Sequence, residues 1–134
     1  MKKRTENDLY VAISNYLRLQ YPNTIFHFDS GSGAKMSIGM AVRQKRINPH
    51  RGYPDLFIAE AKGKFNGFFL EIKKEGTRLT NKKGQWATPH LKEQGEMIDK
   101  LQEAGYYAQF AVGFDNCKSQ IDYYMNLQNF DNLF

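Results

Sequence analysis

Two acids and a lysine in this sequence have types and a spacing that could do chemistry together. Asp55 ends the string Gly-Tyr-Pro-Asp, and after fifteen further residues the string Glu-Ile-Lys places Glu71 and Lys73 two positions apart. Side chains of a β-strand alternate between its faces, so Glu71 and Lys73 share one face. The other face holds the apolar residues Phe68, Leu70 and Ile72. We therefore expect the carboxylates of Asp55 and Glu71 to converge at a strand end, beside the ammonium group of Lys73.

Converging carboxylates suit Mg²⁺ or Mn²⁺, which takes one or two protein carboxylates and fills its other positions with water and substrate phosphate. Such an ion would neutralise a phosphate and lower the pKa of a bound water, while Lys73 would orient that water or stabilise the developing negative charge. The chemistry indicated is hydrolysis of a phosphodiester. A Glu-x-Lys pair alone is also typical of a solvated strand, so the preceding Gly-Tyr-Pro-Asp string carries much of the weight.

These residues need a scaffold, and the sequence predicts one α/β domain over residues 1–134, a length that can bury one core. Hydrophobic periodicity and capping residues predict three helices, over 5–20, 89–104 and 116–127. Short apolar runs predict four strands, over 24–28, 54–59, 67–73 and 106–112, with the second and third joined as a hairpin. Two polar loops are predicted over 30–52, with a helical turn near 40–44, and over 76–88.

The helix ends carry recognisable signals. Thr5 is the expected N-cap of the first helix, Pro89 opens the second, and Asp115 or Asn116 caps the third.

Positive charge is concentrated in the middle of the chain. Residues 35–83 carry twelve Lys or Arg against four acids, a net +8, whereas the whole chain is +5. A polyphosphate partner needs such a basic surface, because each neutralised phosphate releases counterions, although a solvated Lys-rich surface is the alternative. We predict that nine residues in the two loops hold DNA backbone: Lys35, Arg43, Lys45, Arg46, Arg51, Lys74, Arg78, Lys82 and Lys83.

Several classes of protein are disfavoured. No apolar run approaches the roughly 18 to 20 residues that cross a bilayer, and the N-terminus lacks the apolar core of a secretory signal. We therefore expect no membrane partner and a location inside the cell, in the cytoplasm or nucleoid. The single cysteine, Cys117, can neither close an internal disulfide nor share a zinc ion with a second thiol. Because no base-reading helix or zinc finger is evident, recognition of DNA shape is favoured over recognition of sequence.

The Gly-x-Pro-Asp string and the Phe-Leu-Glu-Ile-Lys strand resemble the PD-(D/E)xK nuclease superfamily, and within it the VRR-NUC (virus-type replication and repair nuclease) domain. The likeness extends from the helix that carries Glu6, through both motifs and Gln94, to the last strand. It implies a restriction-endonuclease-like αβββαβ core with a mixed central sheet flanked by helices. It also implies that Asp55 and Glu71 bind metal with Glu6 nearby, and that Lys73 is catalytic.

Two features of the sequence agree with these roles. Glu6 lies on the helical stripe of Tyr10 and Leu17, and a carboxylate on a core-facing stripe needs a partner or a metal. Gln94 lies in line with Leu91, where an apolar residue would pack better, and we add it to the catalytic group. The alternatives are that Glu6 favours the helix dipole and that Gln94 caps a neighbouring backbone group.

One segment departs from the family pattern. Members of the family often carry an Asn-bearing box after the first strand, where this chain has His-Phe-Asp-Ser-Gly at 27–31. The roles of His27 and Asp29 are therefore open. We interpret His27 as a hydrogen-bonded structural residue, with substrate contact as the alternative.

Stand-alone members of the resembled family include homodimeric resolvases of four-way (Holliday) DNA junctions. The resemblance thus implies a Mg²⁺- or Mn²⁺-dependent, structure-selective endonuclease that acts on branched DNA in repair, as a homodimer. The alternatives are a non-catalytic DNA-binding module with the same fold and an enzyme that acts on RNA. The acidic pair favours an enzyme, because binding alone would not require two carboxylates amid so much positive charge.

Overall fold

The computed structural model describes residues 5–29 and 37–128. Its elements are, in chain order, α1 (Glu6–Gln20), β1 (Phe26–Phe28), α2 (Ile38–Ile47), β2 (Leu56–Ile58), β3 (Phe68–Lys73), α3 (Pro89–Glu103), β4 (Tyr107–Val112) and α4 (Phe114–Met125). The strands form one sheet in the order β1-β2-β3-β4, antiparallel from β1 to β3 and parallel between β3 and β4. The predicted α/β class, the β2–β3 hairpin and the mixed sheet are confirmed.

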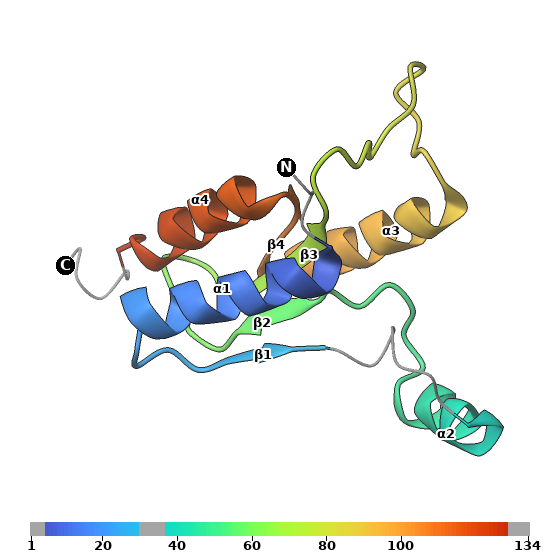
Figure 1. Ribbon diagram of the computed structural model, residues 1–134, viewed down its shortest axis with the longest axis horizontal. Helices are drawn as coiled ribbons and strands as arrows, with labels where there is room; N and C mark the ends of the chain where they lie inside the picture. The colour runs from blue at the N-terminus through green and yellow to red at the C-terminus, as the bar shows by residue number, and fades with distance from the viewer. Residues whose placement is uncertain (1–4, 30–36, 129–134) are drawn as a thin grey trace.

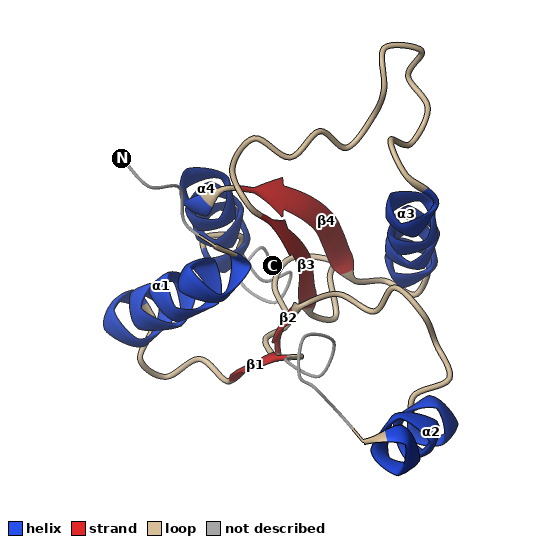
Figure 2. Cartoon of the chain, turned by 45° about the vertical axis from the view of Figure 1, so that its right-hand side comes forward, coloured by secondary structure: helices blue, strands red, loops and turns tan. Residues whose placement is uncertain are grey.

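The sheet is covered on both faces (Figures 1 and 2). Helices α1 and α4 pack on the face of Phe68, Leu70 and Ile72, where the main core lies with Leu9, Ile13 and Leu17 of α1. Helix α3 packs on the other face, where Phe69 and Ala108 meet Ile98. Because every residue of β3 except Lys73 is buried, Glu71 lies under α3 rather than on a solvated face.

The helix starts follow the sequence in two cases and depart from it in one. Thr5 forms a capping box with Asp8, and Thr88 accepts a hydrogen bond from the Leu91 amide just before Pro89. The expected cap of α4 is wrong: Gly113 is its N-cap and makes no side-chain cap hydrogen bond. The Asn116 side chain instead accepts from the Val112 amide at 2.9 Å, tying the helix to β4.

The predicted helical turn near 40–44 is too short, because the structure has the three-turn helix α2 over Ile38–Ile47. Ser37 caps it by accepting from the Met40 amide at 3.2 Å. None of its side chains is buried, so the sequence shows no broad core-facing stripe there. Figures 1 and 2 show α2 projecting from the body of the protein.

The loop between β3 and α3 also projects (Figures 1 and 2). Its outer part is a small hairpin in which Thr80 bridges Trp86 and the Asn81 amide donates to the Gln85 carbonyl at 2.8 Å. We call residues 79–87 the hairpin arm. Across the described ranges no helix has the length and apolar character that a bilayer crossing demands.

Candidate active site

Asp55 and Glu71 meet where β2 begins and β3 nears its end. Leu56 pairs with Leu70, so continuing the antiparallel register by one residue sets Asp55 opposite Glu71. The Ile72 amide donates to Oδ2 of Asp55 at 2.8 Å, which fixes the carboxylate against β3. Asp55 is 8% exposed and Glu71 3% exposed. The two acids of the predicted pair are therefore adjacent at one end of the two central strands, at nearly buried positions.

Glu71 is held by two side chains. Gln94 of α3 donates from Nε2 to Oε1 of Glu71 at 2.7 Å, and Nζ of Lys73 lies 3.5 Å from the same oxygen. The other carboxylate oxygen, Oε2, is buried without a hydrogen-bond partner, and so is Oε1 of Gln94. Buried oxygens without a donor are costly, and a cation beside Oε2 would offset that cost. The alternative that Gln94 caps a backbone group is wrong, since its donor goes to a carboxylate.

The electrostatics of Glu71 reflect this crowding. Burial first, and then the charge of Asp55, raise the pKa of Glu71 to about 9, although Lys73 acts to lower it. Two carboxylates this close cannot both ionise easily without added positive charge. A divalent cation between them would supply that charge.

The turn before Asp55 depends on a glycine. Gly52 has φ +74°, and a Cβ there would stand 3.0 Å from both the Gln94 Cα and the Glu93 carbonyl oxygen. Only a residue without a side chain fits both the left-handed conformation and this close approach. Gly52 therefore lets the Pro-Asp turn press against the turn of α3 that carries Gln94.

Sequence reasoning missed one residue of the site, Tyr10 of α1. Its hydroxyl lies beside Asp55; burial first, then the interaction with Asp55 and the charges of Glu6 and Glu71, raise the pKa of Tyr10 well above its usual value. The ring packs on Phe28 at a centroid distance of 5.4 Å. Its place on an apolar stripe made it look like a core residue, yet its spacing of four from Glu6 could have pointed to the site.

The expectation that Glu6 faces the core is wrong. Glu6 is exposed in the first turn of α1, next to a hollow it shares with Lys74 and Thr77. Within the described residues no three His, Cys, Asp or Glu side chains gather closely enough to hold a metal ion. Glu6 thus lies at an exposed position near Tyr10, where its charge acts on the same hydroxyl as those of Asp55 and Glu71.

The basic residues predicted to hold DNA lie on two projections. Arg43, Lys45 and Arg46 are exposed on α2, with Arg51 just before the Pro-Asp turn. Lys74, Arg78, Lys82 and Lys83 are exposed along the loop and hairpin arm, and Lys35 falls outside the described residues. Figures 1 and 2 show the two projections on either side of α3.

Trp86 fixes the hairpin arm to the body. Its ring lies 5.5 Å from that of Phe110 and so close to Gly95 that a Cβ there would stand 2.4 Å from Cζ2 of the indole. The arm is therefore an ordered extension seated on α3, one residue along from Gln94.

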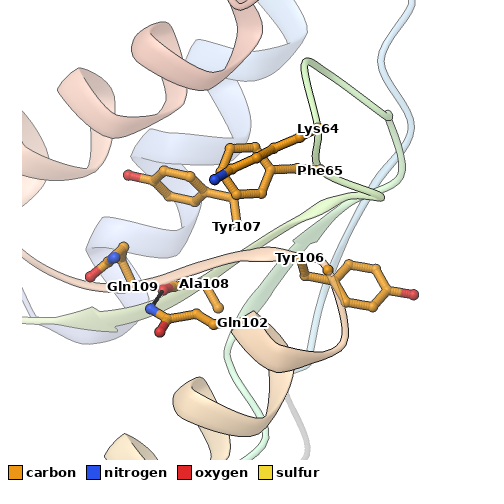
Figure 3. A pocket seen from close by; sticks show the side chains of 8 residues that line it. Lys64, Phe65, Gln102, Tyr106, Tyr107, Ala108 and Gln109 are labelled. Atoms are coloured by element: carbon orange, nitrogen blue, oxygen red, sulfur yellow. Dashed lines mark hydrogen bonds between the residues drawn. The ribbon is translucent and has the colours of Figure 1, made fainter. Parts of the chain in front are cut away.

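A second hollow lies at the other end of the sheet, where β3 and β4 begin (Figure 3). Lys64, Phe65, Tyr106 and Tyr107 line it, and Gln102 donates to the Ala108 carbonyl beneath it at 2.8 Å. Among the described residues, none that lines this hollow carries a carboxylate or an imidazole. It therefore offers no ligand for the predicted metal, and the chemistry-bearing residues are at the opposite end of β3.

The αβββαβ core, the mixed sheet and an acidic pair beside a lysine at a strand end define a nuclease-like domain with a restriction-endonuclease-like fold. A solved structure described as a VRR_NUC domain protein matches with a TM-score of 0.73 and 30% sequence identity, covering 96% of this chain and 94% of that chain. The chain belongs to the VRR-NUC family. No protein-family profile and no curated protein sequence matches it.

Proposed function

We propose that this protein is a divalent-metal-dependent, structure-selective DNA endonuclease, with Asp55 and Glu71 as metal ligands and Lys73 as the catalytic cation. The supporting observation is the buried Oε2 of Glu71, which has no hydrogen-bond partner although it adjoins a second carboxylate. The donor set fits Mg²⁺ or Mn²⁺, because these ions take one or two carboxylates and complete their shell with water and phosphate oxygens. When bound, the ion would supply Lewis acidity and an activated water.

The remaining side chains have distinct tasks in this proposal. The Ile72 amide holds Asp55 in place, the Tyr10 hydroxyl lies beside the same carboxylate, and Gln94 holds Glu71. Lys73 is 13% exposed, so its ammonium group can reach a phosphate while its stem stays buried. We assign it the stabilisation of negative charge that develops on the phosphate.

Branched DNA, and the four-way junction in particular, is the substrate class that we propose. Basic residues project on both sides of α3 and would contact phosphates, which position DNA without reading its bases. A linear duplex presents its phosphate backbone along one axis, so one basic surface can contact it. A branch point presents backbone in several directions, which two separate basic projections could contact.

Two symmetric cuts in a junction need two active sites, so we propose a homodimer. Helix α2 supports it, because Ile38 and Val42, which lie one turn apart on the same side of the helix, are 86% and 48% exposed. A ten-residue helix without packing is marginal in water. A second copy of the chain that covers these apolar side chains would stabilise α2. An Ile38→Asp variant should then be monomeric by light scattering; a dimer that persists would exclude α2 as the interface.

The test of the function is cleavage of end-labelled four-way junction, flap, linear duplex and RNA in Mg²⁺, Mn²⁺ or EDTA. We expect junction products with either metal, none in EDTA, and none with Lys73→Ala, which should still bind DNA. Lys62→Ala is a matched control, because Lys62 also pairs with a glutamate, Glu60 at 3.2 Å, but at the other end of β2 and β3. Bound but uncut DNA under all conditions would favour a non-catalytic module, and cleavage of RNA alone would refute the DNA assignment.

A further inference from the structure

A cavity of about 410 Å³ lies beside the acidic pair, between the end of β1 and the segment that follows α2. His27 and Asp29 line it from the β1 edge, and Ile47, Pro49, His50 and Tyr53 line it from the opposite side. None of these residues has a task in the reaction described above.

The cavity and the acidic pair lie at the same end of the sheet's strands. Phe28 pairs with Leu56, so the register continued by one residue sets Asp29 opposite Asp55, and the Asp29 amide donates to the Asp55 carbonyl at 2.7 Å. Tyr53 is two residues before Asp55 in the same turn. A phosphate held at Asp55 and Glu71 would therefore carry its neighbouring nucleoside to the mouth of this cavity.

The lining is made of rings. Tyr53 is 46% exposed, and its ring is held edge-on against Phe69 at a centroid distance of 5.5 Å. The imidazoles of His27 and His50 stand in the same cavity, with the apolar Ile47 and Pro49. Aromatic side chains of this kind bind nucleobases by stacking, which tolerates any base because every base has a π-face.

Charge decides between a base and a phosphate as the occupant. Asp29 lines the cavity, and its charge adds to burial in raising the pKa of Tyr53. A carboxylate repels phosphate but can accept from the amino groups of a base edge. The neighbouring cations Arg46 and Arg51 are exposed on either side of the segment 47–50. The DNA backbone would lie outside the cavity along these two cations, while a base enters the cavity.

We propose that this cavity binds an unstacked nucleobase next to the phosphate at the acidic pair. The proposal rests on the endonuclease function above and specifies its substrate: DNA in which a base beside the cut can leave the helix, as at a branch point. We expect an uninterrupted duplex to bind weakly at the acidic pair, because unstacking a paired base within a continuous helix costs free energy. At a branch point part of that stacking is already absent.

The test couples a change in the protein to a change in the DNA. Dissociation constants are measured in EDTA, without cleavage, for junctions that carry one abasic nucleotide at each position flanking the cut. We expect one position at which losing the base weakens wild-type binding about tenfold. Tyr53→Leu should weaken binding to the intact junction by a similar factor. For this variant, the dissociation constant for that abasic junction should be close to the one for the intact junction. Tyr53→Phe, which keeps the ring, should bind like wild type.

Tyr123→Leu is the matched control, since Tyr123 is 59% exposed on α4 and packs near Tyr107, away from this cavity. His50→Ala, at an exposed position, repeats the cycle if Tyr53→Leu fails to fold. If the Tyr53→Leu substitution and the abasic nucleotide change the dissociation constant independently at every position, while the protein still cuts DNA, the base pocket alone would be overturned. Failure of the wild-type protein to bind or cut DNA would overturn the endonuclease function and the pocket with it.

Discussion

The side-chain amide of Gln94 donates to Oε1 of Glu71 at 2.7 Å, while each residue keeps one buried oxygen without a partner. This contact joins α3 to the middle of the sheet at the point where Gly52 brings the Pro-Asp turn against the same helix. Gln94 of α3 therefore positions Glu71 within the acidic pair.

Gln94→Leu should slow DNA cleavage about 10- to 100-fold, the usual effect of removing a residue that orients a metal ligand. Junction affinity should stay within about twofold, because the basic projections are untouched. Single-turnover rates and dissociation constants measure the two effects. Gln102→Leu, on the same helix but bonded to the Ala108 carbonyl, should cut like wild type. Wild-type cleavage by Gln94→Leu would show that Glu71 needs no such support.

Metal binding should depend on pH through Glu71. Burial and Asp55 raise its pKa from an ordinary 4.5 to about 9, so between these values the metal-free folded state holds a proton that the unfolded chain does not. Stability of the metal-free protein from this group is therefore greatest below pH 4.5 and declines as pH rises toward 9. A cation must displace that proton, so the Tm gain from Mg²⁺ should grow from pH 6 to pH 9. Glu71→Gln should lose this trend; an equal Tm gain in the wild-type protein at every pH would contradict it.

Gly95→Ala should dislodge the hairpin arm, because the new Cβ would stand 2.4 Å from the Trp86 indole. Trp86 is the only tryptophan, so its emission should shift to longer wavelength as the ring enters water. DNA affinity should fall several-fold as Lys82 and Lys83 lose their fixed position. Gly39→Ala is the control, since a Cβ there meets nothing within 4 Å. Unchanged emission from Gly95→Ala would mean that the helix yields instead of the ring.

Arg78→Ala should weaken junction binding at low salt and lower the slope of log Kd against log salt by about one. Arg78 is exposed at the base of the arm, where one phosphate contact would be lost. Titrations across a range of KCl concentrations measure the slope. Arg18→Ala, exposed on α1 away from both projections, should leave it unchanged. An unaltered slope for Arg78→Ala would place the DNA elsewhere.

Tyr10→Phe should reduce cleavage about tenfold or more without unfolding the protein, because it removes the hydroxyl at Asp55 but keeps the ring against Phe28. Tyr16→Phe is the matched control on the same helix, where the lost hydroxyl bonds to Asp122. The control should lower Tm while cutting at the wild-type rate. Equal effects of the two variants on both quantities would assign Tyr10 a purely structural role.

The sequence by itself determined the local elements and the core of the site. Alternation along β3 sets Glu71 and Lys73 on the face opposite the apolar residues, and the periodicity of α1 and α3 follows from which side chains are buried. The Pro-Asp string could be placed beside Glu71 because a short hairpin leaves little freedom in strand register. These features depend on residues that are close in the sequence, so the pattern of residue types is enough to predict them.

Only the tertiary structure decided which distant groups reach the acidic pair. Tyr10 contacts Asp55 because α1 packs across the sheet, and no local pattern separates such a tyrosine from a core residue. Glu6, on the same stripe, is exposed because the stripe leaves the core in the first helical turn. Helix α2 was not recognised at its full length for the opposite reason. Hydrophobic periodicity in a sequence arises where one face of a helix is buried, and α2 buries none of its side chains within its own chain.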